Sequence, residues 1–150
     1  MHPRLDYTKA APDAFQAVYA LERYVSEQSG IEPRLIHLLK LRASQINHCA
    51  YCVDLHTKEA RRDGLSEQWI ALVCVWRESP LFDARERALL AWVEAVTLVA
   101  DEAVPDEIFD GMRAHFTDEE ITKLTVAIGT INIWNRLSVG FQVTHPIDQA

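Results

Sequence analysis

Helix start and stop signals recur at short intervals along the chain, and this pattern constrains the fold more than any other feature. Glycine is scarce, at 5 of 150 residues, and the alternation of apolar and polar residues that is typical of strands is absent. Two capping-box patterns, Asp83-Ala84-Arg85-Glu86 and Thr117-Asp118-Glu119-Glu120, precede long runs of helix-spaced apolar residues. We therefore expect an all-α fold.

These signals predict about seven helical segments in a single domain over residues 1–150, a length that suits one hydrophobic core. The segments are expected at 13–29 with Gly30 as the stop, from Pro33, at 49–64, from Ser66, from Asp83, from Pro105 to about His115, and from Thr117 toward Val143. The last segment is apolar around most of its circumference. It is therefore expected to be central, or buried in a subunit interface.

Charge and hydropathy exclude several classes of partner. The formal net charge is −7 and the basic residues are scattered, which disfavours nucleic acids and anionic membranes. No apolar run approaches the roughly 20 residues that span a bilayer. The first residues lack an apolar signal region, so we expect a cytoplasmic protein, in a compartment that keeps thiols reduced.

A cysteine pair at the start of the third segment carries the strongest chemical signal. Cys49 and Cys52 are spaced so that they can close a disulfide in a first helical turn, where unpaired N–H groups favour the thiolate. His56 follows Cys52 by one turn and can transfer protons. The helix dipole favours Cys49 as nucleophile, whereas proximity to His56 favours Cys52. Cys74, in an apolar run, is expected to be a buried, inert thiol.

Two other uses of the pair are weaker. A structural disulfide does not suit a reducing compartment. A zinc site made by Cys49, Cys52 and His56 with His37 or His48 would lack the second CxxC or paired histidines of common zinc modules. No bound metal or cofactor is therefore expected, and His48 is expected to point elsewhere.

The segment from Leu38 to Arg61, LLKLRASQINHCAYCVDLHTKEAR, resembles the carboxymuconolactone decarboxylase-like superfamily, and within it the AhpD-like alkylhydroperoxidase branch. The resemblance continues through Glu86-Arg87-Ala88-Leu89-Leu90, Val104-Pro105-Asp106 and Ile131-Asn132-Ile133-Trp134-Asn135-Arg136-Leu137, and so covers nearly the whole chain. It implies an all-helical AhpD-like fold that assembles as a homo-oligomer, a trimer or hexamer, and reduces organic hydroperoxides.

The resemblance also implies roles for the cysteines. Cys52 would attack the peroxide and become a sulfenic acid, and Cys49 would resolve it to a redox-active disulfide. A lipoyl-bearing protein, or another external dithiol, would then return the electrons.

The chain departs from this family at the proton relay. The family glutamate lies twelve positions before the first cysteine, and that position, 49 − 12 = 37, is His37 here; Tyr51 replaces the histidine inside the CxxC. His37 could relay a proton but supplies no fixed negative charge. Glu59, three residues after His56, could orient that histidine. We expect His56 near one sulfur and His37 within direct or water-bridged reach.

The remaining residues of the family segments are expected to be structural. Trp134, Asn135 and Arg136 belong to this group, because an aromatic residue on a buried helix is more often part of the core than of a ligand site. Arg42, Ser44 and Gln45 are expected to hold the cysteine helix to its neighbour through hydrogen bonds.

The leading hypothesis is a thiol-dependent peroxidase in which Cys52, Cys49, His56 and His37 perform the chemistry. The first alternative is a lyase that decarboxylates a lactone, a branch that does not depend on a CxxC pair. The second is a non-catalytic thiol sensor of oxidation, an alternative that the histidine at position 37 favours.

Overall fold

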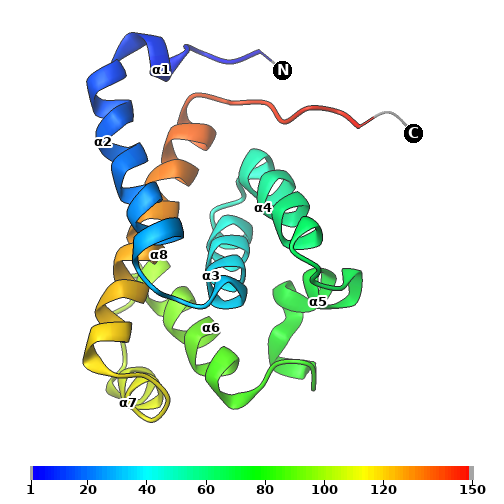
Figure 1. The fold of residues 1–150 in the computed structure, drawn as a ribbon, viewed down its shortest axis with the longest axis vertical. Helices are drawn as coiled ribbons and strands as arrows, with labels where there is room; N and C mark the ends of the chain where they lie inside the picture. The colour runs from blue at the N-terminus through cyan, green and yellow to red at the C-terminus, as the bar shows by residue number, and fades with distance from the viewer. Residues whose placement is uncertain (1, 149–150) are drawn as a thin grey trace.

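The computed structural model describes residues 2–148, and within them every regular element is helical (Figure 1). The α-helices are α1 (Tyr7–Ala10), α2 (Pro12–Arg23), α3 (Pro33–Ile46), α4 (Ala50–Arg62), α5 (Glu67–Leu72), α6 (Ala84–Thr97), α7 (Asp106–Arg113) and α8 (Asp118–Gly140). The expected all-α fold is confirmed. In the described part of the chain, no helix is long and apolar enough to cross a membrane.

The helices begin and end at the predicted signals. Both capping boxes form: the Asp83 and Thr117 side chains accept the N–H groups of Glu86 and Glu120, whose carboxylates bond back to the capping residues. Gly30 and Gly64 end their segments in the left-handed region, at φ 72° and 87°.

Two local features were not predicted. α1 is a single turn, capped by the Asp6 side chain on the Thr8 N–H at 3.1 Å, and is too short to show apolar periodicity. The segment after α5, Val73–Glu78, is a 3₁₀ helix. Because 3₁₀ side chains repeat every three residues, Val73 and Trp76 are both buried while Cys74 is exposed. The prediction that Cys74 is buried is therefore wrong.

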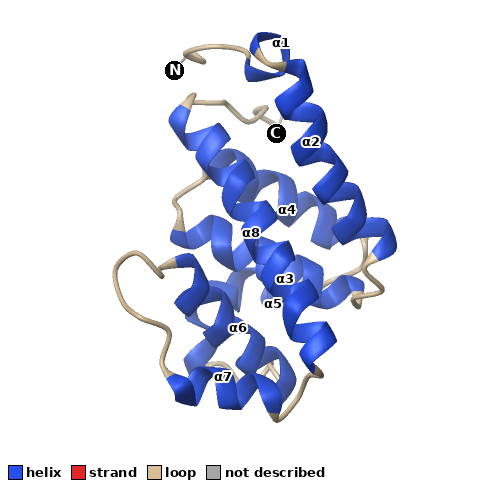
Figure 2. Ribbon diagram, turned by 90° about the vertical axis from the view of Figure 1, so that its left-hand side faces the viewer, coloured by secondary structure: helices blue, strands red, loops and turns tan. Residues whose placement is uncertain are grey.

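α3 is the centre of the fold, and it packs against α4, α6 and α8 (Figure 2). Its Leu38, Leu39 and Leu41 are almost completely buried. α8, the segment expected to be central or buried in a subunit interface, packs along α3 and also contacts α2, α4 and α6. α4, which carries the cysteine pair at its start, therefore lies against both α3 and α8.

α2 lies alongside α8 on the outside of the bundle (Figure 1). It contains no buried residue, although Val25 in the π-helical turn that continues it, Tyr24–Gln28, is buried. α2 supplies Phe15, Tyr19 and Glu22 to a cavity that also contains Cys52. Its place in the fold thus matters more for the site than for the core.

Candidate functional site: a cysteine pair beside a cavity with apolar and charged walls

Cys49 lies in a tight turn that ends α3 and starts α4. The Cys49 N–H donates to the Ser44 carbonyl at 3.0 Å and the His48 N–H to that of Gln45 at 3.2 Å, which is the Schellman pattern of a helix end. His48 occupies the left-handed position of this motif, at φ 53°, where glycine is usual. Two backbone hydrogen bonds therefore fix the position from which the Cys49 side chain starts.

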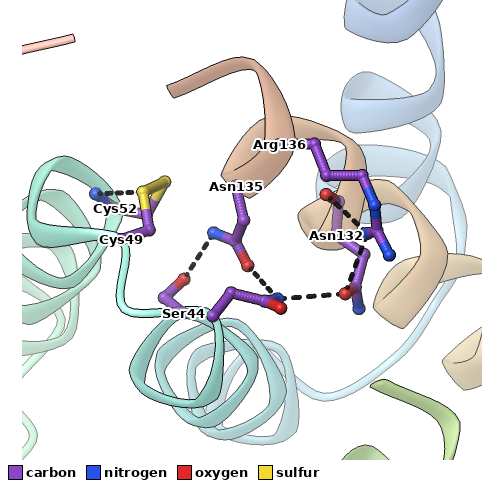
Figure 3. The surroundings of a disulfide bond; sticks show 7 residues. Ser44, Cys49, Cys52, Asn132, Asn135 and Arg136 are labelled. Atoms are coloured by element: carbon purple, nitrogen blue, oxygen red, sulfur yellow. Dashed lines mark hydrogen bonds between the residues drawn. A yellow bond between two sulfur atoms is a disulfide. The ribbon is translucent and has the colours of Figure 1, made fainter. Parts of the chain in front are cut away.

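The two cysteines form a disulfide at the first turn of α4, with their Cα atoms 5.3 Å apart (Figure 3). Cys49 is the N-cap residue, and its Sγ accepts the Cys52 N–H at 3.3 Å. Both residues are buried, at 1% and 3% exposure. After reduction, the same N–H group and the helix dipole would favour a thiolate at Cys49.

His56 and Glu59 form a hydrogen-bonded pair one turn further along α4. His56 Nδ1 and Glu59 Oε2 are 2.9 Å apart, as the spacing of three residues predicted. Burial lowers the pKa of His56, against the opposing effect of Glu59, so its neutral form is favoured. The bond from His56 lowers the pKa of Glu59. With Nδ1 donating to this carboxylate, Nε2 is the nitrogen free to accept a proton.

A second charged pair, Glu22 with Lys40, was not anticipated. Lys40 lies among the leucines of α3 and its ammonium contacts Glu22 Oε1. Trp134 Nε1 donates to Glu22 Oε2 at 3.1 Å, and Ser26 Oγ donates to Oε1 at 2.9 Å. Burial alone would raise the pKa of Glu22, but Lys40 and these hydrogen bonds lower it. A lysine inside the Leu38-Leu39-Lys40-Leu41 run was the available signal, since such a position requires a buried partner.

These groups border a cavity of about 280 Å³. Its apolar wall consists of Tyr7, Phe15, Tyr19, Tyr51, Leu55 and Trp134, and its polar lining of Cys52, His56, Glu59, Glu22, Lys40 and Ser138. Phe15 packs edge-on against Trp134, with ring centroids 5.9 Å apart. Cys52 borders the cavity but Cys49 does not. A reactant in this cavity would therefore meet Cys52 first.

His37 lies outside this cavity. Its Nε2 is 2.8 Å from Asp63 Oδ2, and its buried Nδ1 has no hydrogen-bond partner among the described residues. It lines a second cavity of about 340 Å³, which Glu22, Lys40 and Glu59 also border. Cys52 and His56 thus border the same cavity and Cys49 is bonded to Cys52, whereas His37 lies beside Asp63. A part for His37 in the proton relay stays a prediction.

An amide network beside the cysteine pair joins the end of α3 to α8 (Figure 3). Asn47 Nδ2 donates to Asn132 Oδ1 at 3.0 Å and to Asn135 Oδ1 at 2.9 Å, and Asn135 Nδ2 donates to Ser44 Oγ at 3.0 Å. Arg136 donates to Asn132 Oδ1 at 3.1 Å. The hydrogen bonds of Ser44 thus extend through Asn135, a residue that was itself expected to be structural.

Arg42 and Gln45 support α3 on another side. Arg42 Nε donates to Glu94 Oε1 of α6 at 2.9 Å, and the Arg42 guanidinium reaches Gln45 Oε1 at 3.4 Å.

Within residues 2–148, no group of three or more histidine, cysteine, aspartate or glutamate side chains is arranged to hold a metal ion.

Sequence comparison identifies the family of the chain. The model of the carboxymuconolactone decarboxylase family matches residues 12–95. The uncharacterized protein YdfG of Bacillus subtilis (strain 168) is 37% identical over 139 residues, covering 93% of this chain and 94% of its own.

Solved structures extend the likeness to the whole fold. ATU0492 of Agrobacterium tumefaciens, a protein of unknown function proposed to be the antioxidant defence protein AhpD, superposes with a TM-score of 0.95 at 61% identity, over 98% of this chain and 100% of its own. An uncharacterized peroxidase-related protein with an alkylhydroperoxidase AhpD core, from Ralstonia eutropha JMP134, shares the fold at a TM-score of 0.81 and 22% identity, over 93% of this chain and 74% of its own. The chain belongs to the carboxymuconolactone decarboxylase family, in its AhpD-like branch.

Proposed function

We propose that the protein is a thiol-dependent peroxidase that reduces organic hydroperoxides through a Cys49–Cys52 dithiol–disulfide cycle. The observation that carries the proposal is the arrangement on α4. Cys52 borders a cavity together with the His56–Glu59 pair, and Cys49, which does not border the cavity, is bonded to Cys52. A nucleophile, a proton acceptor and a resolving thiol are thereby supplied by one helix and its N-cap.

These positions support the following cycle. His56 Nε2 takes the Cys52 thiol proton, and the thiolate attacks the terminal oxygen of the hydroperoxide. The O–O bond breaks, the alkoxide takes a proton from His56 and leaves as an alcohol, and Cys52 becomes a sulfenic acid. Cys49 then attacks the Cys52 sulfur, water leaves, and the disulfide forms. An external dithiol supplies two electrons and two protons to reopen it, and becomes a disulfide itself.

The cavity favours uncharged organic substrates. Its aromatic wall can bury the alkyl or aryl group of a hydroperoxide. Glu22 and Glu59 have lowered pKa values and the pKa of His56 is also lowered, so the polar lining presents two carboxylates, one ammonium and a neutral imidazole near pH 7. This net negative lining disfavours a carboxylate-bearing substrate.

Turnover with matched cysteine variants tests the proposal. Consumption of an organic hydroperoxide is followed with a dithiol reductant such as dihydrolipoamide. Cys52→Ser and Cys49→Ser should abolish turnover, while Cys74→Ser, which removes an exposed thiol outside the cavity, should keep it. Full activity in both Cys52→Ser and Cys49→Ser would sink the proposal.

The proposal includes a lipoyl-bearing protein as reductant, a cytoplasmic location and a trimeric or hexameric assembly. Support for assembly comes from α2, whose Tyr19 and Leu21 are 45% and 39% exposed on a helix without a buried residue. Light scattering of the purified protein measures the number of subunits. A monomer at micromolar concentration would count against assembly.

A lactone decarboxylase is the second candidate, because the matching family carries that name. The two candidates differ in their need for the cysteine. Turnover of carboxymuconolactone that is unaffected by Cys52→Ser would favour the lyase over the peroxidase.

A further inference from the structure

The turn that carries Cys49 is attached to α8 by side chains as well as to α3 by its backbone. Three residues, Asn47, His48 and Cys49, connect α3 to α4. The Schellman bonds fix the turn locally, but they end within α3. The attachment to α8 is made by Asn47, whose two Nδ2 hydrogens have one acceptor each, on Asn132 and Asn135.

The network continues through buried groups with their own partners. Asn135 is 1% exposed and donates from Nδ2 to the fully buried Ser44 hydroxyl. Asn132 donates from Nδ2 to Thr97 Oγ1 of α6 at 3.2 Å and to the Ile128 carbonyl at 2.9 Å. The side-chain amides of these asparagines are therefore paired across α3, α6 and α8. Satisfied buried networks of this kind fix one geometry, because any displacement leaves a polar group without a partner.

We propose that Asn47, held by Asn135 and Asn132, is a positioning residue that sets the thiol–disulfide equilibrium of Cys49 and Cys52. In the dithiol form, the network keeps the Cys49 turn where the bond can close. Closure then costs less conformational entropy than it would in a free turn. The disulfide is thereby favoured, and a stronger reductant is needed to open it.

This inference rests on the proposed dithiol–disulfide cycle, but its measurement needs no peroxide. The protein is equilibrated in reduced and oxidised glutathione, where opening the disulfide oxidises two glutathione molecules to one glutathione disulfide. Free Cys49 and Cys52 thiols are then alkylated and counted by mass spectrometry. A wild-type protein with a measurable equilibrium but no peroxide turnover would count against the proposed function alone.

Asn47→Ala should shift the equilibrium constant at least tenfold toward the dithiol. This corresponds to a reduction potential that is about 30 mV less negative. Asn47→Ser keeps a single, shorter donor and should shift the constant in the same direction by a smaller factor, so it decides the matter if the alanine variant does not fold. The matched control is Thr125→Ala, which removes the Trp92 Nε1 to Thr125 Oγ1 bond between α6 and α8 at 2.9 Å without touching the turn.

The thiol–disulfide equilibrium constant of Thr125→Ala should stay within twofold of the wild-type value, even if its melting temperature falls as far as that of the Asn47 variants. Wild-type constants in the folded Asn47 variants would overturn the proposal. An equal shift in Thr125→Ala would also overturn it, since the effect would then be one of general stability.

Discussion

Glu22 forms an ion pair with Lys40 in the lining of the cavity that Cys52 borders. Glu22→Gln removes the negative charge of this pair and keeps the shape of the side chain. The Lys40 side chain is 6% exposed and the Glu22 side chain 21%, so the remaining ammonium would be buried with its main partner neutralised. Removing one partner of a buried ion pair costs about 3–5 kcal/mol. The glutamine oxygen can still accept from Trp134, and Glu22 is partly solvated, so we expect a loss of about 2–3 kcal/mol in the free energy of unfolding.

A double-mutant cycle separates the pair from its surroundings. Lys40→Met alone leaves Glu22 with its bonds from Trp134 and Ser26 and with some solvent contact, so its cost should be smaller, about 1–2 kcal/mol. Since exchanging a whole buried pair for uncharged groups is often close to neutral, the double variant should be at least about 1 kcal/mol more stable than Glu22→Gln.

Urea unfolding at pH 7 measures all four proteins. Glu67→Gln is the matched control, because it neutralises the exposed partner of Arg61 and should leave the unfolding midpoint unchanged. Additive effects in the cycle, or a Glu22→Gln midpoint equal to that of wild type, would refute the assignment of a buried ion pair.

Three further changes test other parts of the site. In the unfolded chain His56 binds a proton below its ordinary pKa of about 6.5, whereas burial lowers its pKa in the folded protein. The urea concentration at the unfolding midpoint should therefore decrease as the pH is lowered from 7 to 5, and it should decrease less in His56→Gln. An equal decrease in the two proteins would contradict this. His48→Gly should raise the free energy of unfolding by about 0.5–1 kcal/mol, because glycine relieves the left-handed backbone at φ 53°, and a loss of stability would count against strain there. Reduced Cys52 should react faster with neutral iodoacetamide than with anionic iodoacetate, by a larger ratio of rates than a neutral cysteine peptide shows, and Glu22→Gln should lower this ratio. A ratio of rates equal to that of the peptide would mean that the cavity lining does not disfavour anionic reactants.

The fold was predictable because its signals are local. The caps at Asp83 and Thr117 and the stops at Gly30 and Gly64 each act within a few residues, so spacing alone locates most helix ends. Cys74 was misassigned because its apolar neighbours indicated burial, whereas the 3₁₀ geometry of its segment turns the side chain outward.

The site was predictable where it lies within one helix. His56 and Glu59 are three residues apart on α4, and they are bonded. Glu22 and Lys40 are brought together by the placement of α2, which no local pattern encodes. His37 lies ten residues before Asn47, roughly 15 Å along α3 at 1.5 Å per residue, and α4 runs back beside α3 from the turn. It therefore meets Asp63 at the end of α4 rather than the cysteines at its start.

The central claim is that Cys52 takes the peroxide oxygen and Cys49 resolves it, and trapping the sulfenic acid tests this most directly. The reduced Cys49→Ser and Cys52→Ser variants, each also carrying Cys74→Ser, are mixed with one equivalent of an organic hydroperoxide and dimedone, then mapped by mass spectrometry. We predict a dimedone adduct on Cys52 in the first variant, formed much faster than on a free cysteine peptide. An adduct that forms on Cys49 in the second variant, with none on Cys52 in the first, would contradict the account.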